Sequence, residues 1–249
     1  MSTGDGFAVR SLACTYFDGT RLHRHDHPWG QLAFCTSGLM RILTDEVAWL
    51  SPPTRAIWLP AGLVHEIVMK GEVTARFLYI SPGYGARLGG RPQVLEVLPL
   101  LRELILHVLA VGMLHPDKPE HARLAGLLID LLIEARPVDM ALPLPRDRRA
   151  LALATRIQSA LGDTATLTEL ARGVGASLRT LQRLFPEETG LTLEAWRQKA
   201  RLIASAVALS SGAAVNLTAA NCGYESPSAF ITAFKRQFGV TPGRYRAEL

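Results

Sequence analysis

The sequence predicts two domains: an all-β barrel with appended helices, then an all-α domain with tandem helix-turn-helix units. Three observations support this prediction. Short apolar runs separated by turn residues fill roughly the first 90 residues, helical apolar periodicity begins near residue 93, and two segments of the second half repeat at an offset of 49 residues. The length of 249 residues also fits two domains, at about 150 residues for an average domain.

Composition and local patterns exclude several classes of protein. Hydrophobic residues make up 48% of the chain and charged residues 20%, which is ordinary for a globular protein. No apolar run reaches the roughly 20 residues of a membrane span, and the first ten residues lack the pattern of a secretory signal. Cys14, Cys35 and Cys222 show no paired spacing, which favours a reducing compartment. We therefore expect a cytoplasmic protein that does not bind membranes.

Residues 1–92 read as strands separated by glycine- and proline-rich turns. The expected strands cover 31–36, 40–44, 47–50, 56–59, 64–69 and 74–80. Many short strands at close spacing indicate a β-sandwich or barrel.

Residues 93–136 have helical apolar spacing and form the appended helical segment. The first helix is expected to begin around Val94, and the second covers 119–135 with a leucine face. That face consists of Leu124, Leu127, Leu128, Leu131 and Leu132. It either covers the barrel or joins two subunits of a homodimer, and the sequence fits both arrangements. Residues 137–148 contain three prolines and a closing run of charge, which predicts a linker.

Residues 149–249 are predicted to be helical and basic. Helices are expected at 149–161, 166–174, 178–185, 193–209, 217–222, 228–238 and 242–248. Residues 1–145 carry 13 Lys and Arg against 14 Asp and Glu, whereas residues 146–249 carry 14 against 8. The positive charge therefore lies in the second half, which favours a polyanion such as nucleic acid as its partner.

The internal repeat has the anatomy of two helix-turn-helix units. Matching pairs at the 49-residue offset are Ala171 and Ala220, Ser177 and Ser226, Gly190 and Gly239, and Thr192 and Thr241. Gly175 and Gly223 suit the sharp turns, and the two serines suit the N-caps of the helices that follow.

The helix after Ser177 carries a polar face suited to base recognition. Arg179, Gln182 and Arg183 lie at i, i+3 and i+4, opposite an apolar stripe. Arginine can bond guanine bidentately and glutamine can do so with adenine, so this face suits the major groove. A solvated polar face is the competing interpretation, but two tandem units on a basic segment favour DNA binding.

Two segments resemble the AraC/XylS family of bacterial transcription regulators. Residues 220–246, ANCGYESPSAFITAFKRQFGVTPGRYR, resemble the signature of the family, and LTELARGVGASLRTLQRLFPEETG resembles its first helix-turn-helix unit. The resemblance implies two recognition helices, joined by the long helix at 193–209, that enter successive major grooves of promoter DNA. We assign the DNA contacts to Arg179, Thr180, Gln182, Arg183, Ser228, Thr232 and Lys235.

Two residues depart from the pattern of the family. Thr232 stands where the second recognition helix often carries arginine, so we expect weaker base recognition there. Pro186 replaces a position that is commonly basic, and a proline there is expected to end or kink the first recognition helix near Phe185.

The first half also resembles the two cupin motifs. The first motif matches Gly19, His25, His27, Gln31 and Gly38, and the second matches Pro60, Gly62 and His65. Gln31 occupies the position of the usual glutamate, Thr54 that of a glycine, and Met69 that of an asparagine. A cupin barrel fused to a DNA-binding half is a common arrangement in the AraC/XylS family.

The residues point to a metal site independently of that resemblance. His25 and His27 alternate on an expected strand and so project to one face. With Gln31 and His65 they could hold one divalent transition metal, such as Zn, Ni, Fe or Mn. Two interpretations compete with a metal site: a metal-free pocket for a small-molecule effector, and purely structural histidines.

The sequence as a whole favours a one-component transcription regulator. Its barrel senses a small molecule or a divalent metal, its helical segment forms a homodimer, and its basic half binds double-stranded promoter DNA. The rival is a cupin metalloenzyme, a dioxygenase or isomerase, fused to a DNA-binding domain. Gln31 in place of glutamate removes a charge that would help to hold a catalytic metal, so we expect no enzymatic activity.

Overall fold

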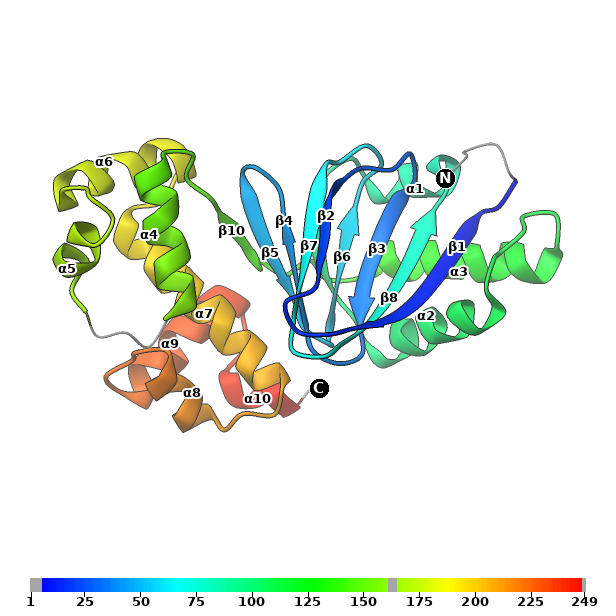
Figure 1. The fold of residues 1–249 in the computed structure, drawn as a ribbon. Coiled ribbons are helices and arrows are strands. Elements are labelled where there is room, and N and C mark those ends of the chain that lie inside the picture. The colour runs from blue at the N-terminus through cyan, green and yellow to red at the C-terminus, as the bar shows by residue number, and fades with distance from the viewer. Residues whose placement is uncertain (1–5, 161–164, 248–249) are drawn as a thin grey trace. The chain divides into compact units, whose positions relative to one another are not determined.

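The computed structural model describes residues 6–160 and 165–247, which fold into two compact units (Figure 1). The first unit runs to Thr44 and from Trp49 to Met140. The second contains Asp45–Ala48 and the residues from Ala141 onward. None of the helices in the described ranges combines the length and apolar character needed to cross a membrane.

The first unit is built on two antiparallel sheets, as the sequence predicts. One sheet has the order β1-β8-β3-β6-β9, formed by β1 (Val9–Tyr16), β8 (Val73–Ile80), β3 (Gly30–Cys35), β6 (Arg55–Leu59) and β9 (Gln93–Glu96). The other contains β5 (Val47–Ser51), β4 (Leu39–Leu43), β7 (His65–Lys70) and β2 (Arg21–His25), in that order. In the registers, Gln31 lies opposite Tyr79, and His25 lies opposite His65.

One face of the first sheet packs against two helices, α2 (Pro99–Val111) and α3 (Pro119–Glu134) (Figure 1). The short helix α1 (Pro82–Gly85) and a 3-10 turn, Ala86–Leu88, precede them. The shared core includes Val9, Leu32, Phe34, Trp58, Leu78, Ile80, Ile105, Val108, Leu128, Ile129 and Leu132. Burial of each large apolar side chain contributes about 1.5–3 kcal/mol, so this layer anchors the helices.

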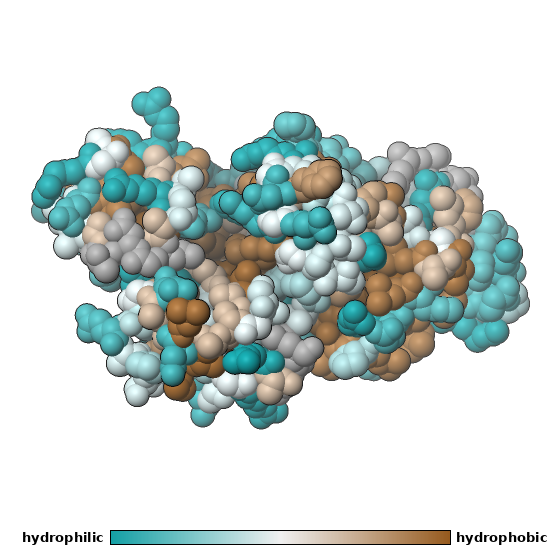
Figure 2. Space-filling model, turned by 60° about the horizontal axis from the view of Figure 1, so that its bottom comes forward, coloured by the Kyte–Doolittle hydropathy of each residue, from teal (hydrophilic) through white to brown (hydrophobic). Residues whose placement is uncertain are grey.

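The leucine face of α3 divides between two environments. Leu128 and Leu132 are buried in the core beneath the helix, so they cover the sheet. The side chain of Leu127 is 45% exposed. Figure 2 shows apolar residues at the surface on the α2 and α3 side of this unit. The exposed apolar residues there are Leu98, Leu100, Val111, Met113, Leu127 and Ile133.

One expectation for the chain between the domains, the start of the first helix, is wrong, and the boundary between the two units falls inside the expected linker. The helical pattern expected from Val94 begins instead with strand β9, which pairs with β6, and α2 starts only at Pro99. Val94 and Leu95 are both buried, and a short apolar run buried on two faces has no period that separates strand from helix. The expected linker, 137–148, contains strand β10 (Ala141–Pro143). β10 lies beside Asp45–Ala48 in the second unit, where the Leu144 N–H donates to the Glu46 carbonyl.

The second unit is helical and has the predicted tandem organisation (Figure 1). Its helices are α4 (Arg148–Ser159), α5 (Leu167–Arg172), α6 (Leu178–Thr189), α7 (Leu193–Ser210), α8 (Val215–Asn221), α9 (Pro227–Phe238) and α10 (Pro242–Ala247). α5 and α6 form one helix-turn-helix unit, α8 and α9 form the other, and α7 connects them. The ends of the helices expected at 149–161 and 242–248 fall at Leu161 and Glu248, outside the described residues.

Both recognition helices begin at the expected serine caps. The Ser177 hydroxyl accepts a hydrogen bond from the Thr180 N–H at 3.1 Å, and the Ser226 hydroxyl accepts one from the Ala229 N–H at 3.2 Å. The turns before them use Gly175, at φ +68°, and Gly223, at φ +73°. Glycine tolerates this left-handed backbone at no steric cost.

Pro186 was expected to end or kink the first recognition helix, and it does not end it. α6 continues through Pro186 to Thr189. Leu184 and Phe185 are buried before the proline, and after it the Thr189 hydroxyl donates to the Phe185 carbonyl at 2.6 Å. A proline leaves the carbonyl four residues earlier without its helical donor, which water can satisfy on an exposed face such as that of Gln182. Packing on both sides of the proline therefore keeps the helical path.

Candidate functional site

The first recognition helix presents its predicted polar face to solvent. Arg179, Gln182 and Arg183 are exposed on α6, whereas Leu181 and Phe185 on the opposite side are buried. This amphipathic arrangement follows from the helical period, since residues at i, i+3 and i+4 share a face. The three exposed side chains offer guanidinium and amide groups for base edges.

Two residues modify that face. Thr180 is half-buried, and its hydroxyl lies 2.8 Å from the Ser177 hydroxyl within the N-cap. The Arg183 guanidinium donates from Nη1 to the Glu187 carboxylate at 2.7 Å, one helical turn further on. Sequence reasoning did not single out Glu187, because it expected the helix to end near Phe185.

The second recognition helix presents a different surface. Ser228 and Thr232 are exposed on α9, as is Lys235, and the opposite side packs its phenylalanines around Tyr245. A pocket of about 390 Å³ lies against the face of α9 that carries small side chains. It is lined by Gln198, Ser228, Ala229, Thr232, Ala233 and Arg236. Sequence reasoning missed Arg236, although its spacing of four residues from Thr232 places it on the same helical face.

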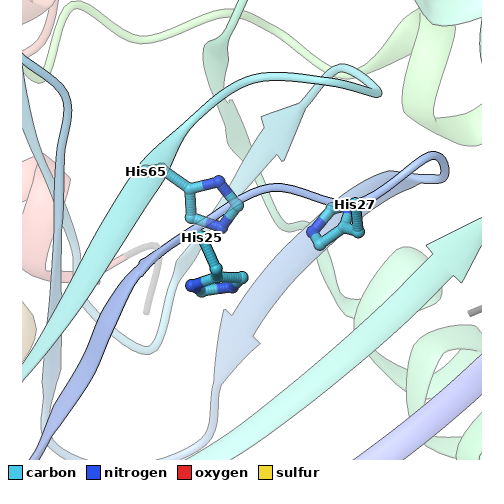
Figure 3. A group of neighbouring side chains, drawn as sticks. All are labelled: His25, His27 and His65. Atoms are coloured by element: carbon cyan, nitrogen blue, oxygen red, sulfur yellow. The ribbon is translucent and has the colours of Figure 1, made fainter.

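Three histidines of the first unit meet where β2 ends and β7 begins (Figure 3). His25 is the last residue of β2, and His65 is the first of β7. His27 follows β2 in a loop, so the expectation that it lies on the same strand as His25 is wrong. Pro28 has no N–H to donate to a sheet, and the Gly62 N–H donates to the His27 carbonyl at 2.9 Å.

Backbone carbonyls orient all three imidazole rings in the same way. Nδ1 lies 2.6 Å from the His23 carbonyl oxygen in His25, 2.5 Å from that of Trp29 in His27, and 2.8 Å from that of Leu63 in His65. A carbonyl oxygen only accepts hydrogen bonds, so each Nδ1 carries the hydrogen in the neutral ring. Each Nε2 is then left with a free lone pair, which is the form that binds a metal ion.

The Nε2 atom of His65 has no hydrogen-bond donor among the described residues. His65 is 1% exposed, and its Nε2 is buried without a hydrogen-bond partner among the described residues. His27 Nε2 lies 3.0 Å from the side-chain amide of Gln31, whose other end lies 3.5 Å from the Tyr79 hydroxyl. An unsatisfied buried acceptor is costly, so this arrangement calls for a cation or a donor between the rings.

The environment also keeps His65 neutral. Burial is the main cause that lowers the pKa of His65 to about 4, and His25 and His27 lower it further. The Leu63 carbonyl and Asp26 oppose this shift only in part. A neutral imidazole is the form required of a metal ligand.

The donor atoms are spaced to fit one small cation. The nitrogen donors of the three histidines all lie within 4.8 Å of one another. Two donors that each lie about 2.1 Å from one ion, at a right angle, are about 3.0 Å apart, which matches the His27–Gln31 distance. The histidine nitrogens, which lie up to 4.8 Å apart, must move closer together around such an ion.

Comparison with known proteins identifies the family of both domains. Residues 12–171 match the AraC-like ligand binding domain, and residues 170–248 match a helix-turn-helix domain. The HTH-type transcriptional regulator NimR of Escherichia coli K12 is 32% identical over 225 residues, which cover 90% of this chain and 82% of that protein. The chain belongs to the AraC family of transcription regulators. It combines a ligand-binding domain with a helix-turn-helix domain that binds DNA.

Two further relatives of this AraC-family chain match it to different extents. The HTH-type transcriptional regulator RipA of Corynebacterium glutamicum is 35% identical over 103 residues, which cover 41% of this chain and 31% of that protein. The crystal structure of ToxT from Vibrio cholerae is 12% identical, with a TM-score of 0.42, and covers 97% of this chain and 98% of ToxT.

The structure places the predicted residues of this AraC-family regulator in two groups. His25, His27, Gln31 and His65 come together in the ligand-binding domain. Arg179, Gln182, Arg183, Ser228, Thr232 and Lys235 are exposed on α6 and α9, and Thr180 is half-buried in the cap. Tyr79 was missed in the first group, because only the strand register brings it opposite Gln31.

Proposed function

We propose that this chain regulates transcription in response to a ligand held at His25, His27, Gln31 and His65, and that this ligand is a divalent first-row transition metal. Zn, Ni, Fe and Mn suit a site of imidazole nitrogens and an amide oxygen. The ligand-binding domain acts as a cupin-like sensor, and the exposed faces of α6 and α9 contact promoter DNA. Such a regulator works where the DNA is, in the cytoplasm.

One observation favours a metal over an organic effector and over purely structural histidines. The three histidines each direct Nδ1 to a backbone carbonyl, the Nε2 of His65 is buried without a partner among the described residues, and one nitrogen of each ring lies within 4.8 Å of the others. Purely structural histidines would satisfy both ring nitrogens, since a lone buried acceptor costs about 1–3 kcal/mol. A bound metal would draw on the lone pairs of these nitrogens, and its binding energy would favour the folded state of the domain.

Metal content tests this proposal directly. Protein purified without a chelator or an affinity-tag nickel column should carry close to one equivalent of Zn, Ni, Fe or Mn by elemental analysis. A double variant, His25→Ala with His65→Ala, should lose it, because half of the ligands are gone. His107→Ala is the matched control, since His107 is exposed on α2 outside the cluster, and it should keep the metal.

A metal-free protein would shift the proposal to an organic effector. The same four side chains would then be hydrogen-bond partners for a polar small molecule. In that case small molecules, and not metal ions, should raise the melting temperature of the protein, because a ligand that binds only the folded state stabilises it. The double variant should lose the regulatory response and keep its affinity for DNA.

We also propose that the chain has no catalytic activity of its own. NimR and RipA, to which it is similar, are transcription regulators. Gln31 is a neutral amide in the position of the usual cupin carboxylate, so a metal there lacks an anionic ligand. Oxygen uptake by the metal-loaded protein in the presence of candidate substrates would contradict this.

A further inference from the structure

An ion pair lies on the recognition face of α6. Arg183 Nη1 and Glu187 Oε2 are 2.7 Å apart, at i and i+4 on the same helix. Their side chains are 61% and 53% exposed, so the pair lies in solvent beside Arg179 and Gln182 and outside the core. It exists because α6 continues past Pro186, which adds the turn that carries Glu187.

The two neighbouring carboxylates of this turn have separate partners. Glu188 accepts hydrogen bonds from the backbone N–H groups of Arg146 at 2.7 Å and Asp147 at 3.0 Å, ahead of α4. Glu187 bonds Arg183. Glu188 therefore supports the fold, whereas Glu187 acts on an arginine of the recognition face. An exposed pair at i and i+4 adds little to the stability of a helix.

We propose that Glu187 is a positioning residue for Arg183 and sets how strongly the protein discriminates its site from other DNA. This inference rests on the proposed role of α6 in base contact. A guanidinium has five N–H donors, so Arg183 keeps free N–H groups for a guanine while Nη1 stays on Glu187. Holding a long side chain in one orientation lowers the entropy that it loses on binding.

The charge of Glu187 also favours discrimination between the selected site and other DNA. Non-specific DNA binding depends on contacts between cationic side chains and phosphates. Arg183 paired with a carboxylate is a weaker phosphate ligand, because Glu187 offsets its charge. Glu187 therefore weakens binding to unrelated DNA more than binding to the selected site.

The test compares two single-charge variants of the full chain. A duplex selected from a randomised pool by the unaltered protein and a scrambled duplex are titrated by fluorescence anisotropy at several KCl concentrations. Glu187→Ala should lower the ratio of the two affinities roughly three- to tenfold, part of the discrimination that one bidentate contact supplies. Its binding to scrambled DNA should also show a salt slope steeper by about 0.9, for one added phosphate contact.

Glu225→Ala is the matched control. Glu225 is exposed in the turn before α9, and its loss removes the same charge from the same unit. This change should shift both affinities together and leave their ratio unaltered. Thermal unfolding of both variants should stay close to that of the unaltered protein.

Arg183→Ala separates the failure of this inference from the failure of the proposed function. The double variant, Arg183→Ala with Glu187→Ala, should discriminate no worse than Arg183→Ala alone, because Glu187 acts through Arg183. If Arg183→Ala relaxes base preference but Glu187→Ala leaves the ratio and the salt slope unchanged, the role of Glu187 is overturned and that of α6 stands. If Arg183→Ala has no effect, both are overturned.

Discussion

The burial and the hydrogen bonding of His65 determine its protonation state. It is 1% exposed, its Nδ1 contacts the Leu63 carbonyl, and its Nε2 has no hydrogen-bond partner among the described residues. Its ring centroid lies 4.5 Å from that of His25 and 5.4 Å from that of His27. Protonation would place a positive charge in that buried position beside two further imidazoles. The fold therefore holds His65 neutral.

That neutrality predicts a pH dependence of stability. The pKa of His65 is about 4 in the folded protein and 6.5 when exposed, so the unfolded state binds more protons between these values. With a chelator present, the free energy of unfolding should fall as pH drops from 6.5 to 4, by at most about 1.4 kcal/mol per pH unit from this group. Urea unfolding at several pH values measures it. An identical slope in His65→Gln would contradict the prediction.

Arg183 and Thr232 allow a prediction about the two recognition helices. Arg183→Ala should cost about 1–3 kcal/mol at the selected DNA site and relax preference at one base position, because a bidentate contact is lost. Thr232→Ala should cost much less, since a threonine makes weaker contacts. Gel-shift titrations of both variants provide the measurement. Equal effects would contradict the assignment of α6 as the main recognition helix.

At the scale of elements, the two helix-turn-helix turns differ in their surroundings. A Cβ at Gly223 would lie 2.9 Å from the Arg201 guanidinium, whereas a Cβ at Gly175 would meet nothing within 4 Å. Arg201 extends from α7 over the second turn, where its Nη1 lies 3.5 Å from the Gly223 carbonyl. The long connecting helix thus contacts the turn that orients α9.

This difference predicts that glycine-to-alanine substitutions in the two turns lower the free energy of unfolding by unequal amounts. Gly175→Ala should destabilise the protein by about 1–2 kcal/mol, the cost of a left-handed backbone for a residue with a Cβ. Gly223→Ala should cost more, because Arg201 must also move. Thermal or urea unfolding of both variants tests the order, and a larger loss for Gly175→Ala would contradict it.

At the scale of the whole molecule, α3 leaves apolar residues exposed that we propose to be used in assembly. Leu128 and Leu132 are buried in the core, but Leu127 and Ile133 are 45% and 49% exposed. Leu131 packs partly against the same core. We propose that the exposed residues form a homodimer interface, as the leucine face of the sequence allows.

Light scattering tests the proposed dimer. Leu127→Glu should give monomers, because a charge in an apolar interface is costly to desolvate, and adding Leu131→Glu should strengthen the effect. Leu217→Glu is the control, since Leu217 is an equally apolar side chain, 57% exposed, on α8 of the other unit. A dimer that survives Leu127→Glu would contradict this interface.

The sequence by itself determined the parts of the fold that local chemistry decides. The helix-turn-helix units, their serine caps and the polar face of α6 follow from periodicity, turn residues and spacing along one chain segment. The resemblance to the cupin motifs also brought His25, His27, Gln31 and His65 into one predicted set. The helix-turn-helix features depend on neighbours within a few residues, so the sequence carries them directly.

Only the tertiary structure decided the features that depend on distant contacts. Val94 and Leu95 form a strand because β6 pairs with them, and α6 passes Pro186 because packing on both sides holds it. The orientation of the imidazoles, and the free Nε2 of His65, depend on backbone carbonyls and on burial that no local pattern records. Long-range packing and hydrogen bonds outweigh local preferences of the order of 1 kcal/mol, which is why these features could not be predicted from the sequence.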